Sequence, residues 1–394
     1  MIKPERKNNR LVLLGAAHSL NHSLFAVTPP LLTMIFSSLN VAKSEIGLVA
    51  TIASFIYGTG ALVGGPLGDR IGEAWTITIS LAFSGFATFI MLAAEATQTI
   101  YIYAFALIMM AIWASLYHPT ANSLISKSFK DKMSESMGLH GVGGTIGVVL
   151  TPTIAYAIGV SFGWSLAFVF FGILCIIAAL FIIKGFGKNG RIRESAGTVL
   201  DALKIRQLWL LLIFNVAIGL FMKGIELFFP TYLVENRGIS PEWAALAYTL
   251  VLAAGVPAQW FGGKAADRIG SRKVLIATSL GVVISLVCLL FLPIHLVGVA
   301  VFIIAYGFSF YAHQPALNSL TGFLSPPSHR GAVYGVFFFT SFGIGSISQL
   351  AAGIIGDLYG LDSAFYMLTG VALAALLLSF KIPERTENRH PSEN

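Results

Sequence analysis

Twelve long apolar segments restrict what this chain can fold into. A helix needs about 20 mostly apolar residues to cross a lipid bilayer. The segments cover approximately residues 11–34, 45–67, 75–95, 100–126, 136–160, 163–184, 207–234, 240–263, 273–292, 295–324, 330–355 and 361–381. Water-soluble domains carry charges on roughly a quarter of their residues, but only 11% of this chain is charged and its mean hydropathy is +0.80. We expect an all-α integral membrane protein with twelve transmembrane helices.

Two short patterns each occur twice, about half a chain length apart. Gly-Pro-Leu-Gly-Asp-Arg-Ile-Gly at residues 65–72 returns as Gly-Lys-Ala-Ala-Asp-Arg-Ile-Gly at residues 263–270, with the aspartates 198 residues apart. His-Pro-Thr-Ala-Asn-Ser-Leu at residues 118–124 returns as Gln-Pro-Ala-Leu-Asn-Ser-Leu at residues 314–320. Unrelated patterns that repeat at nearly one spacing indicate a duplication, and this period is far too long for a solenoid. The expected architecture is two pseudo-symmetric six-helix bundles, as in transporters that bind substrate between parallel halves.

The longest polar break between apolar segments divides six predicted helices from six. It contains a Gly-Lys-Asn-Gly-Arg run and several further charges. The predicted organisation is an N-terminal bundle at residues 1–184, a cytoplasmic linker at 185–206, a C-terminal bundle at 207–381 and a cytoplasmic tail at 382–394.

The distribution of basic residues predicts the orientation in the membrane. Of the 25 lysines and arginines, all but Lys43, Arg237 and Lys223 fall on the side that holds the N-terminus. Basic residues concentrate on the cytoplasmic side of membrane proteins, so both termini are expected on that side. The protein is expected to lie in the cell membrane. This bias also accounts for the net charge of +7, and nucleic-acid binding is not needed to explain it.

With twelve predicted spans, a six-plus-six division and a doubled Gly-Asp-Arg motif, the chain resembles the major facilitator superfamily of secondary transporters. The resemblance implies that the motif helps to set the balance between inward-facing and outward-facing states. By this resemblance the gating residues are Gly65, Asp69, Arg70, Gly72, Asp267, Arg268 and Gly270. In the first copy Glu73-Ala74 stands where a basic pair commonly follows, whereas the second copy keeps Arg272-Lys273.

A narrower resemblance lies in the predicted fourth and fifth helices. Tyr117-His118-Pro119, and the glycine run at residues 143–147 followed by Pro152, are similar to fosmidomycin-resistance-type exporters. Drug antiporters commonly carry a Gly-Pro dipeptide in a glycine-rich fifth helix, and this chain lacks it.

Lys223 and Glu226 lie deep in the predicted seventh helix, three residues apart and therefore on one face. Ionisable residues inside a span are costly and usually face a cavity or a partner. One interpretation is a static ion pair that allows both groups to be inserted. The other is proton coupling, in which a proton on Glu226 frees Lys223 to bind an anionic substrate.

Histidines supply most of the remaining polar chemistry inside the spans. His18 and His22 are one turn apart in the first span with Asn21 beside them, and the others are His118, His140 and His313. Histidine titrates near neutral pH, so it can relay protons, bind anions or simply form hydrogen bonds. We assign His22 to proton coupling as well as to substrate binding. A metal site at His18 and His22 is the weaker alternative because no acidic or thiol cluster accompanies the pair, and none is predicted.

The repeated Pro motif adds further candidates. His118 and Gln314 precede equivalent prolines, which tend to kink helices, and their divergence suggests a substrate or proton role. Trp113 and Tyr117, four residues apart, are candidates for an aromatic wall of the cavity, with core packing as the alternative. The predicted substrate-binding residues are His18, Asn21, His22, Trp113, Tyr117, His118, Lys223, Glu226, His313 and Gln314.

Together these features predict a secondary active transporter that moves a small organic solute, expected to be anionic, by proton-coupled alternating access. The alternatives are a multidrug-type proton antiporter that exports apolar drugs and a non-transporting membrane receptor or sensor. No nucleotide-binding motif or enzymatic motif is found. The expected partners are membrane lipid, the substrate and protons; no cofactor or nucleic acid is expected, and the functional unit is expected to be a monomer.

Overall fold

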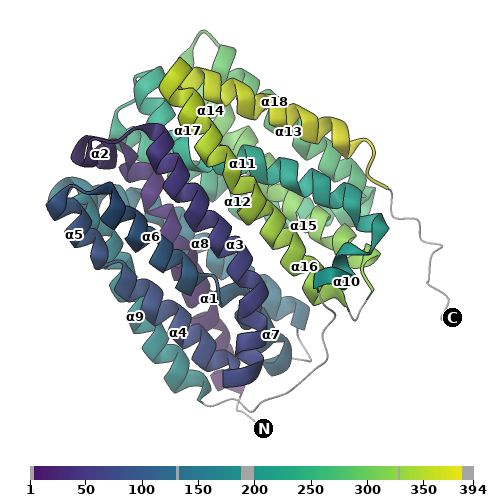
Figure 1. Ribbon diagram of the computed structural model, residues 1–394. Helices are drawn as coiled ribbons and strands as arrows, with labels where there is room; N and C mark the ends of the chain where they lie inside the picture. The colour runs from purple at the N-terminus through teal and green to yellow at the C-terminus, as the bar shows by residue number, and fades with distance from the viewer. Residues whose placement is uncertain (1–3, 130–132, 188–198, 327–328, 384–394) are drawn as a thin grey trace.

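The computed structural model describes residues 4–129, 133–187, 199–326 and 329–383, which are almost entirely helical and contain no strand. In the first half the elements are α1 (Pro4–Ala26), α2 (Thr28–Leu39), α3 (Lys43–Ile71), α4 (Glu73–Ala87), α5 (Ile90–Thr97), α6 (Ile100–Ala114), α7 (Tyr117–Ser128), α8 (Met133–Phe162) and α9 (Trp164–Phe186). Figure 1 shows how these helices pack side by side.

A short α10 (Val199–Leu203) and the 3-10 turn η2 (Arg206–Leu208) lie within or next to the predicted linker, most of which is outside the described residues. The second half then contains α11 (Trp209–Arg237), α12 (Pro241–Ile269), α13 (Ser271–Phe291), α14 (His295–Val301), η3 (Phe302–Tyr306), α15 (Gly307–Leu324), α16 (Arg330–Phe338), η5 (Phe339–Gly343), η6 (Ile344–Ser346), α17 (Ile347–Tyr359) and α18 (Leu361–Ser379).

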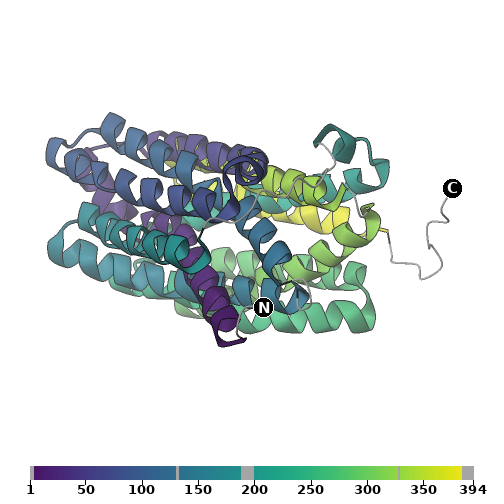
Figure 2. The same ribbon diagram turned by 90° about the horizontal axis from the view of Figure 1, so that it is seen from below.

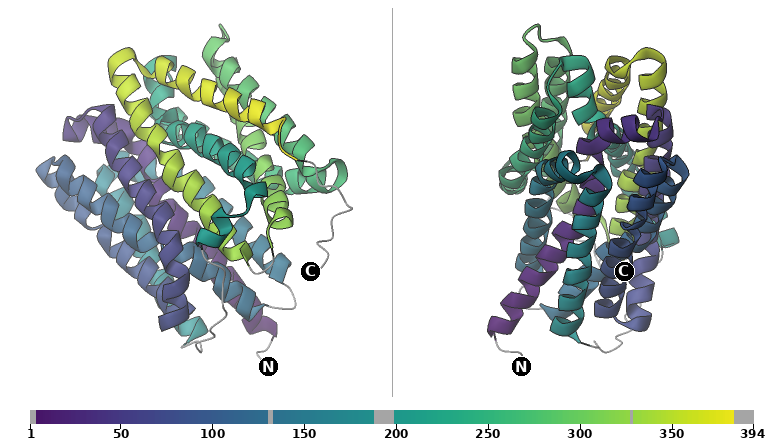
Figure 3. Two further views of the ribbon diagram at one scale, coloured as in Figure 1. Left: turned by 45° about the vertical axis from the view of Figure 1, so that its right-hand side comes forward. Right: turned by 90° about the vertical axis from the view of Figure 1, so that its left-hand side faces the viewer.

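The described residues contain 12 helical segments that are long and apolar enough to cross a membrane, which confirms the expected number. Several spans are made of two or more consecutive elements, such as α1 with α2 and α6 with α7. The first six spans form one bundle and the last six another, beside each other in the views of Figure 2 and Figure 3. Because the number of spans is even, α1 begins and α18 ends on the same side, here called the termini end. The opposite side, which holds the α2–α3 and α17–α18 connections, is the far end.

The fourth span is interrupted where the repeated Pro motif begins. Pro119 has no N–H to donate to the carbonyl of Ser115, four residues earlier. The helix breaks there, with α6 ending at Ala114 and α7 beginning at Tyr117. The equivalent Pro315 lies inside a continuous α15, and a π-helical turn, η3, precedes that helix. The two copies of the motif therefore shape their helices differently.

Glycines spaced by four on α3 let this helix approach the fourth span closely. A Cβ atom on Gly60 would lie 1.9 Å from Ser115 Oγ, and one on Gly64 would lie 2.7 Å from Pro119 Cγ. A Cβ atom on Gly68 would lie 3.1 Å from Thr120 Cγ2. Small residues at every fourth position are typical of closely packed membrane helices, and here they set the distance between the second and fourth spans.

The Gly-Asp-Arg motifs form the last two turns of α3 and α12, whereas the sequence predicts short loops. Each turn consists of one glycine: Gly72 has a φ of 98° and Gly270 a φ of 93°, a conformation that is costly for residues with a Cβ atom. Arg70, Asp267 and Arg268 are exposed, and the side chain of Asp69 lies outside the described part of the structure. The gating role of these residues stays a prediction.

The residues that distinguish the two copies are held by different neighbours. Glu73 is 3% exposed, and its Oε1 atom lies 2.5 Å from Lys127 Nζ and 3.2 Å from Ser123 Oγ, both on α7. In the second half, Arg272 Nη2 donates to the carbonyl of Phe380, 2.6 Å away, just beyond the last residue of α18. An acid in the first turn of a helix and a base at a helix C-terminus both interact favourably with the helix dipole. Because the two copies differ in sequence at this point, each glycine turn is bonded to a different helix of its own bundle.

Polar contacts join the two bundles at the far end. Asp357, at the end of α17, accepts hydrogen bonds from the backbone N–H groups of Lys43 (3.0 Å) and Ser44 (2.8 Å). Lys43 Nζ also lies 3.1 Å from Glu235 Oε2 on α11. A carboxylate is stabilised at a helix N-terminus because the first N–H groups have no partner within the helix. Asp357, Glu235, Lys43 and Ser44 are called the far-end latch below.

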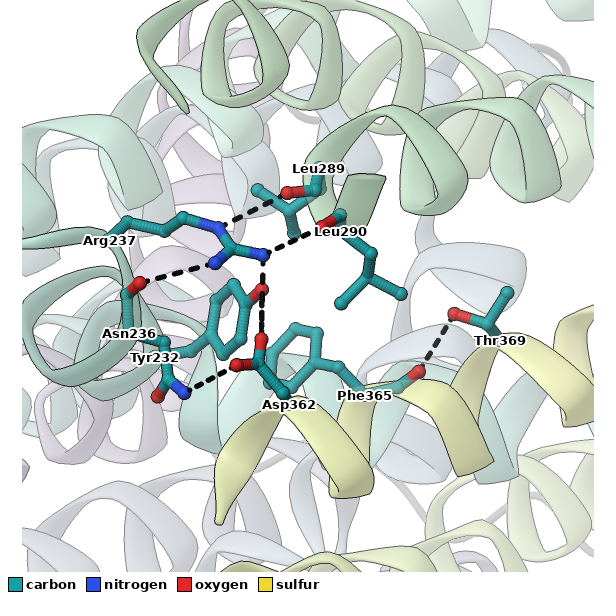
Figure 4. A network of polar contacts seen from close by, with 8 residues as sticks. All are labelled: Tyr232, Asn236, Arg237, Leu289, Leu290, Asp362, Phe365 and Thr369. Carbon is teal, nitrogen blue, oxygen red and sulfur yellow. Dashed lines mark hydrogen bonds and ion pairs between the residues drawn. The ribbon is translucent and has the colours of Figure 1, made fainter. Parts of the chain in front are cut away.

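Within the second bundle, Asp362 in the first turn of α18 fastens the far end of α11. It accepts from Tyr232 Oη (2.9 Å) and Asn236 Nδ2 (3.0 Å) and lies 3.4 Å from Arg237 Nη2. The same guanidinium donates to the carbonyls of Leu289 and Leu290 at the end of α13 (Figure 4). This network joins the far ends of α11, α13 and α18 within the second bundle.

We predict that Gly64→Ala destabilises the protein, whereas Gly65→Ala on the same turn does not. A Cβ atom added at Gly64 would meet Pro119 and the carbonyl of Leu116 at 2.7–2.8 Å, but one added at Gly65 has nothing closer than 4.0 Å. Overpacking of this kind costs about 1–3 kcal/mol. The measurement is the thermal unfolding midpoint of each purified variant in detergent. Equal midpoints for the two variants would contradict the close-packing role of Gly64.

We predict that Asp357→Asn opens the far end. The substitution removes the charge that binds the α3 N-terminus, an interaction of about 1 kcal/mol, so the open population should rise about fivefold. Spin labels at Ser37→Cys and Tyr359→Cys, in a background without Cys175 and Cys288, report the separation of the bundles as a distance distribution. Glu45→Gln is the matched control because Glu45 caps the same helix from within its own bundle, at the N–H of Ala42. A shift of equal size in that control would exclude the cross-bundle latch.

Candidate functional site

A cavity of about 80 Å³ lies between the two bundles, and both contribute to its wall. It is lined by His22, Phe25, Ala26, Thr28, Pro29, Ala50, Ala53, Ser54, Tyr57, Leu107, Val148, Lys223, Glu226, Leu227, Phe342 and Gln349. The first bundle supplies mostly small and aromatic side chains, and the second supplies both charged groups. Three of the predicted site residues, His22, Lys223 and Glu226, therefore meet at one cavity.

Lys223 and Glu226 form an ion pair inside α11. Lys223 is 7% exposed, and its Nζ atom lies 2.6 Å from Glu226 Oε2 and 4.3 Å from the centre of the Phe342 ring. The side chain of Glu226 is 37% exposed and faces the cavity. A buried ammonium needs a negative partner or strong hydrogen bonds. Here the partner comes from the next turn of the same helix, as the spacing predicts.

Four histidines of the first bundle form one cluster. His22 Nε2 lies 3.0 Å from His18 Nε2, and the ring of His118 lies 4.8–5.0 Å from both rings. His140, from α8, stacks on His18 with the ring centres 4.2 Å apart and the planes 13° apart. Its backbone carbonyl accepts from His18 Nδ1 at 2.9 Å. The structure thus brings together three predicted substrate residues and adds His140 to them.

Glycines on α8 make room for this cluster. A Cβ atom on Gly144 would lie 2.4 Å from His18 Nδ1, and one on Gly143 would lie 2.6 Å from the Cα of Gly15. Ser19 donates a hydrogen bond to the carbonyl of Gly143. The glycine run of the fifth span therefore has a structural role, because it lets α8 pack directly against α1 and places the His18 ring.

Asn21 and Tyr117 are engaged in hydrogen bonds between helices. Asn21 is fully buried; its Nδ2 donates to the carbonyl of Ala114 (3.1 Å) and its Oδ1 accepts from Tyr57 Oη (2.7 Å). Tyr117 Oη donates to the carbonyl of Leu14 at 2.9 Å. Both residues hold α1 against its neighbours, and neither lines the cavity.

Trp113, His313 and Gln314 are not brought to the cavity. Trp113 stacks on Phe83 of α4, with ring centres 4.7 Å apart, because the helix break before Tyr117 ends the regular spacing that relates the two residues. His313 is 5% exposed, and its Nδ1 bonds to the carbonyl of Phe310 in its own helix. Gln314 is partly exposed on α15 and does not line the cavity.

Sequence reasoning missed two residues of the site and left His140, which it named, out of the substrate-binding set. Tyr57 lines the cavity and lies against Phe25 and Phe342, with ring centres 4.8 Å and 6.0 Å away. Gln349 also lines the cavity, and its Oε1 atom is buried without a hydrogen-bond partner among the described residues. His140 joins the cluster through packing alone. A polar side chain in the middle of an apolar span was the available signal for Gln349 and Tyr57.

Comparison with known proteins identifies the architecture. The family described as the Major Facilitator Superfamily matches residues 12–350. The chain belongs to the major facilitator superfamily. As members of this family are transporters, this chain is classed as a membrane transporter rather than an enzyme, and contacts with lipid and a small-molecule substrate follow from that class.

Individual relatives of this superfamily member agree with the assignment. The fosmidomycin resistance protein of Escherichia coli is 24% identical over 395 residues, covering 96% of this chain and 93% of that protein. The glycerol-3-phosphate transporter of Bacillus subtilis is 22% identical over 386 residues, covering 88% and 86%. The crystal structure of the nucleoside transporter NupG has a TM-score of 0.81 at 14% identity, covering 95% of this chain and 99% of that one. The last comparison supports the fold alone.

Proposed function

We propose that this chain is a proton-coupled transporter of a small organic anion, with Lys223 as the anion-binding group. The observation that carries the proposal is the cavity-lining Lys223–Glu226 ion pair, in which the ammonium is buried and its carboxylate partner is accessible. A glycerol-phosphate transporter among the relatives supports an anionic substrate. The substrate class of this chain rests on the charge of the site.

Glu226 and the substrate anion compete for the positive charge of Lys223, and this competition couples proton binding to anion binding. While Glu226 is ionised it satisfies Lys223 at 2.6 Å. When Glu226 takes up a proton, Lys223 becomes a buried charge without a partner, and an anion in the cavity restores the balance. Proton and anion therefore bind together, and loss of the proton expels the anion. Gln349 Oε1, which has no partner among the described residues, adds an acceptor for a substrate hydroxyl group.

The transport cycle follows from the two-bundle architecture. The bundles rock about the cavity, with the far-end latch closing one side and the Asp-Arg motifs at residues 69–70 and 267–268 closing the other. The concentration of basic residues at the termini end supports a cytoplasmic location for that end, and in that orientation the far-end latch closes the outer side. The working unit is the monomer in the cell membrane, with the linker at residues 185–206 dividing the bundles.

Export of apolar drugs is the second candidate because aromatic side chains make up part of the wall. Tyr57 lies between Phe25, Phe338 and Phe342, all within 6.0 Å between ring centres. A thermal-shift screen of the purified protein separates the candidates. It uses organic anions, glycerol 3-phosphate among them, and lipophilic cations, each at two pH values. Stabilisation by anions, stronger at the lower pH, supports the proposal; stabilisation only by lipophilic cations favours drug export.

We predict that Glu226→Gln abolishes proton-driven transport of the anion found in that screen and leaves counterflow intact. The neutral amide permanently mimics the protonated carboxyl group, so Lys223 can still bind the anion but no proton is exchanged. Proteoliposomes with an imposed pH gradient measure the driven flux, and proteoliposomes preloaded with the anion measure counterflow.

Lys223→Gln should weaken anion binding by about 10–100-fold, since a hydrogen bond to a charged group contributes about 1.5–3 kcal/mol.

Glu45→Gln, at an exposed carboxylate of the far end, is the control and should retain both activities. Driven uptake by Glu226→Gln at the normal rate would refute the coupling role of the ion pair. Saturable binding by the unaltered chain without any flux would instead identify a receptor or sensor.

A further inference from the structure

Three histidines of the first bundle bring ring nitrogens close to one another. One nitrogen from each of His18, His22 and His118 can be chosen so that all lie within 4.8 Å of one another. The first two are one helical turn apart on α1, and the third comes from α7. A tetrahedral zinc ion, about 2.0–2.1 Å from each nitrogen, places its ligand atoms about 3.4 Å apart. His18 Nε2 and His22 Nε2, 3.0 Å apart, are already near that spacing.

The hydrogen bond to His140 orients His18 for metal binding. A backbone carbonyl only accepts, so His18 Nδ1 must donate to the carbonyl of His140, 2.9 Å away. In the neutral ring this leaves the lone pair on Nε2, the atom that faces His22. Metal-bound histidines usually donate the other ring N–H to a carbonyl or carboxylate in this way, which fixes the tautomer and the ring plane.

His118 contributes an atom that the fold leaves unsatisfied. Its Nε2 atom is buried and has no hydrogen-bond partner among the described residues. A buried polar atom without a partner costs about 1–3 kcal/mol. The ring nevertheless stays between His18, His22 and Phe338, with ring centres 4.8–5.1 Å away. A ligand that accepted the lone pair of His118 would remove this cost.

The surroundings define which ions would bind. The three candidate ligands are imidazoles, which suit zinc, nickel and copper, whereas magnesium and calcium require oxygen ligands. His22 lines the cavity, so an ion can reach the cluster from there and keep a water molecule as its fourth ligand. The nearby positive charge of Lys223 is compensated by Glu226 at 2.6 Å, which limits its repulsion of a cation.

We propose that His18, His22 and His118 form a binding site for one divalent transition-metal ion, such as Zn²⁺, at the cavity face of the first bundle. All three ligands belong to the same bundle, so the ion fastens α1 to α7 without linking the two halves. The site does not depend on the proposed anion transport, because it uses neither Lys223 nor Glu226.

The test uses the full-length protein in detergent, purified with an affinity tag that contains no histidine and treated with a chelator. Titration with Co²⁺ should produce visible d–d absorption that saturates at one ion per chain and disappears when Zn²⁺ is added. His22→Gln and His118→Gln should each weaken binding by at least about tenfold, since even the loss of an outer-shell partner commonly does so. His313→Gln (buried, second bundle) and His295→Gln (exposed, start of α14) are the controls and should bind Co²⁺ normally.

X-ray absorption of the zinc-loaded, unaltered chain provides a second measurement that needs no variant. It should show three imidazole ligands and one oxygen ligand. Absence of stoichiometric binding, a first shell with fewer than three imidazoles, or equal affinity in His118→Gln and His313→Gln would each overturn the proposal.

Discussion

Lys223 and Glu226 bring a positive and a negative charge into the middle of a membrane-spanning helix. Each alone would cost at least about 2.5–3.5 kcal/mol to insert at that depth, and the ion pair at 2.6 Å offsets much of it. Because both residues belong to α11, the pair stays intact when the bundles move relative to each other. In the proposed cycle, rocking of the bundles leaves this ion pair in place, and protonation or ligand binding is what changes it.

The first bundle stabilises its buried polar groups in another way, by hydrogen bonds between helices. Its polar side chains bond to neighbouring helices, as in the chain from Tyr57 through Asn21 to Ala114 and in the bond from His18 to His140. These bonds make it a firm wall for a cavity whose charges come from the second bundle. The two bundles thus have the same architecture but contribute different groups near the cavity. The first contributes imidazoles, and the second contributes an ion pair.

Hydropathy and local spacing were sufficient to predict the twelve spans, the Lys223–Glu226 pair and the neighbouring His18 and His22, because a helix of regular period determines them all. Trp113 packs on Phe83 and does not line the cavity, because that period ends at the break before Tyr117. The joining of His118 and His140 to the first pair depends on how α7 and α8 pack on α1, which Gly143 and Gly144 permit. Such packing between distant segments cannot be read from the spacing along one helix.

The far-end latch was likewise beyond sequence reasoning. Asp357 lies at the end of α17, but its partners on α3 lie more than 300 positions earlier in the chain. A carboxylate at a helix N-terminus is favourable wherever the fold brings the two together. Only the arrangement of the bundles determines which helix that is.

Infrared difference spectroscopy of the purified chain, recorded on addition of the transported anion, tests the central claim most directly. If anion and Glu226 compete for Lys223, binding should produce the C=O stretching band of a newly protonated carboxyl group, and this band should be missing in Glu226→Gln. An anion that binds to the unaltered chain without generating that band would contradict the account.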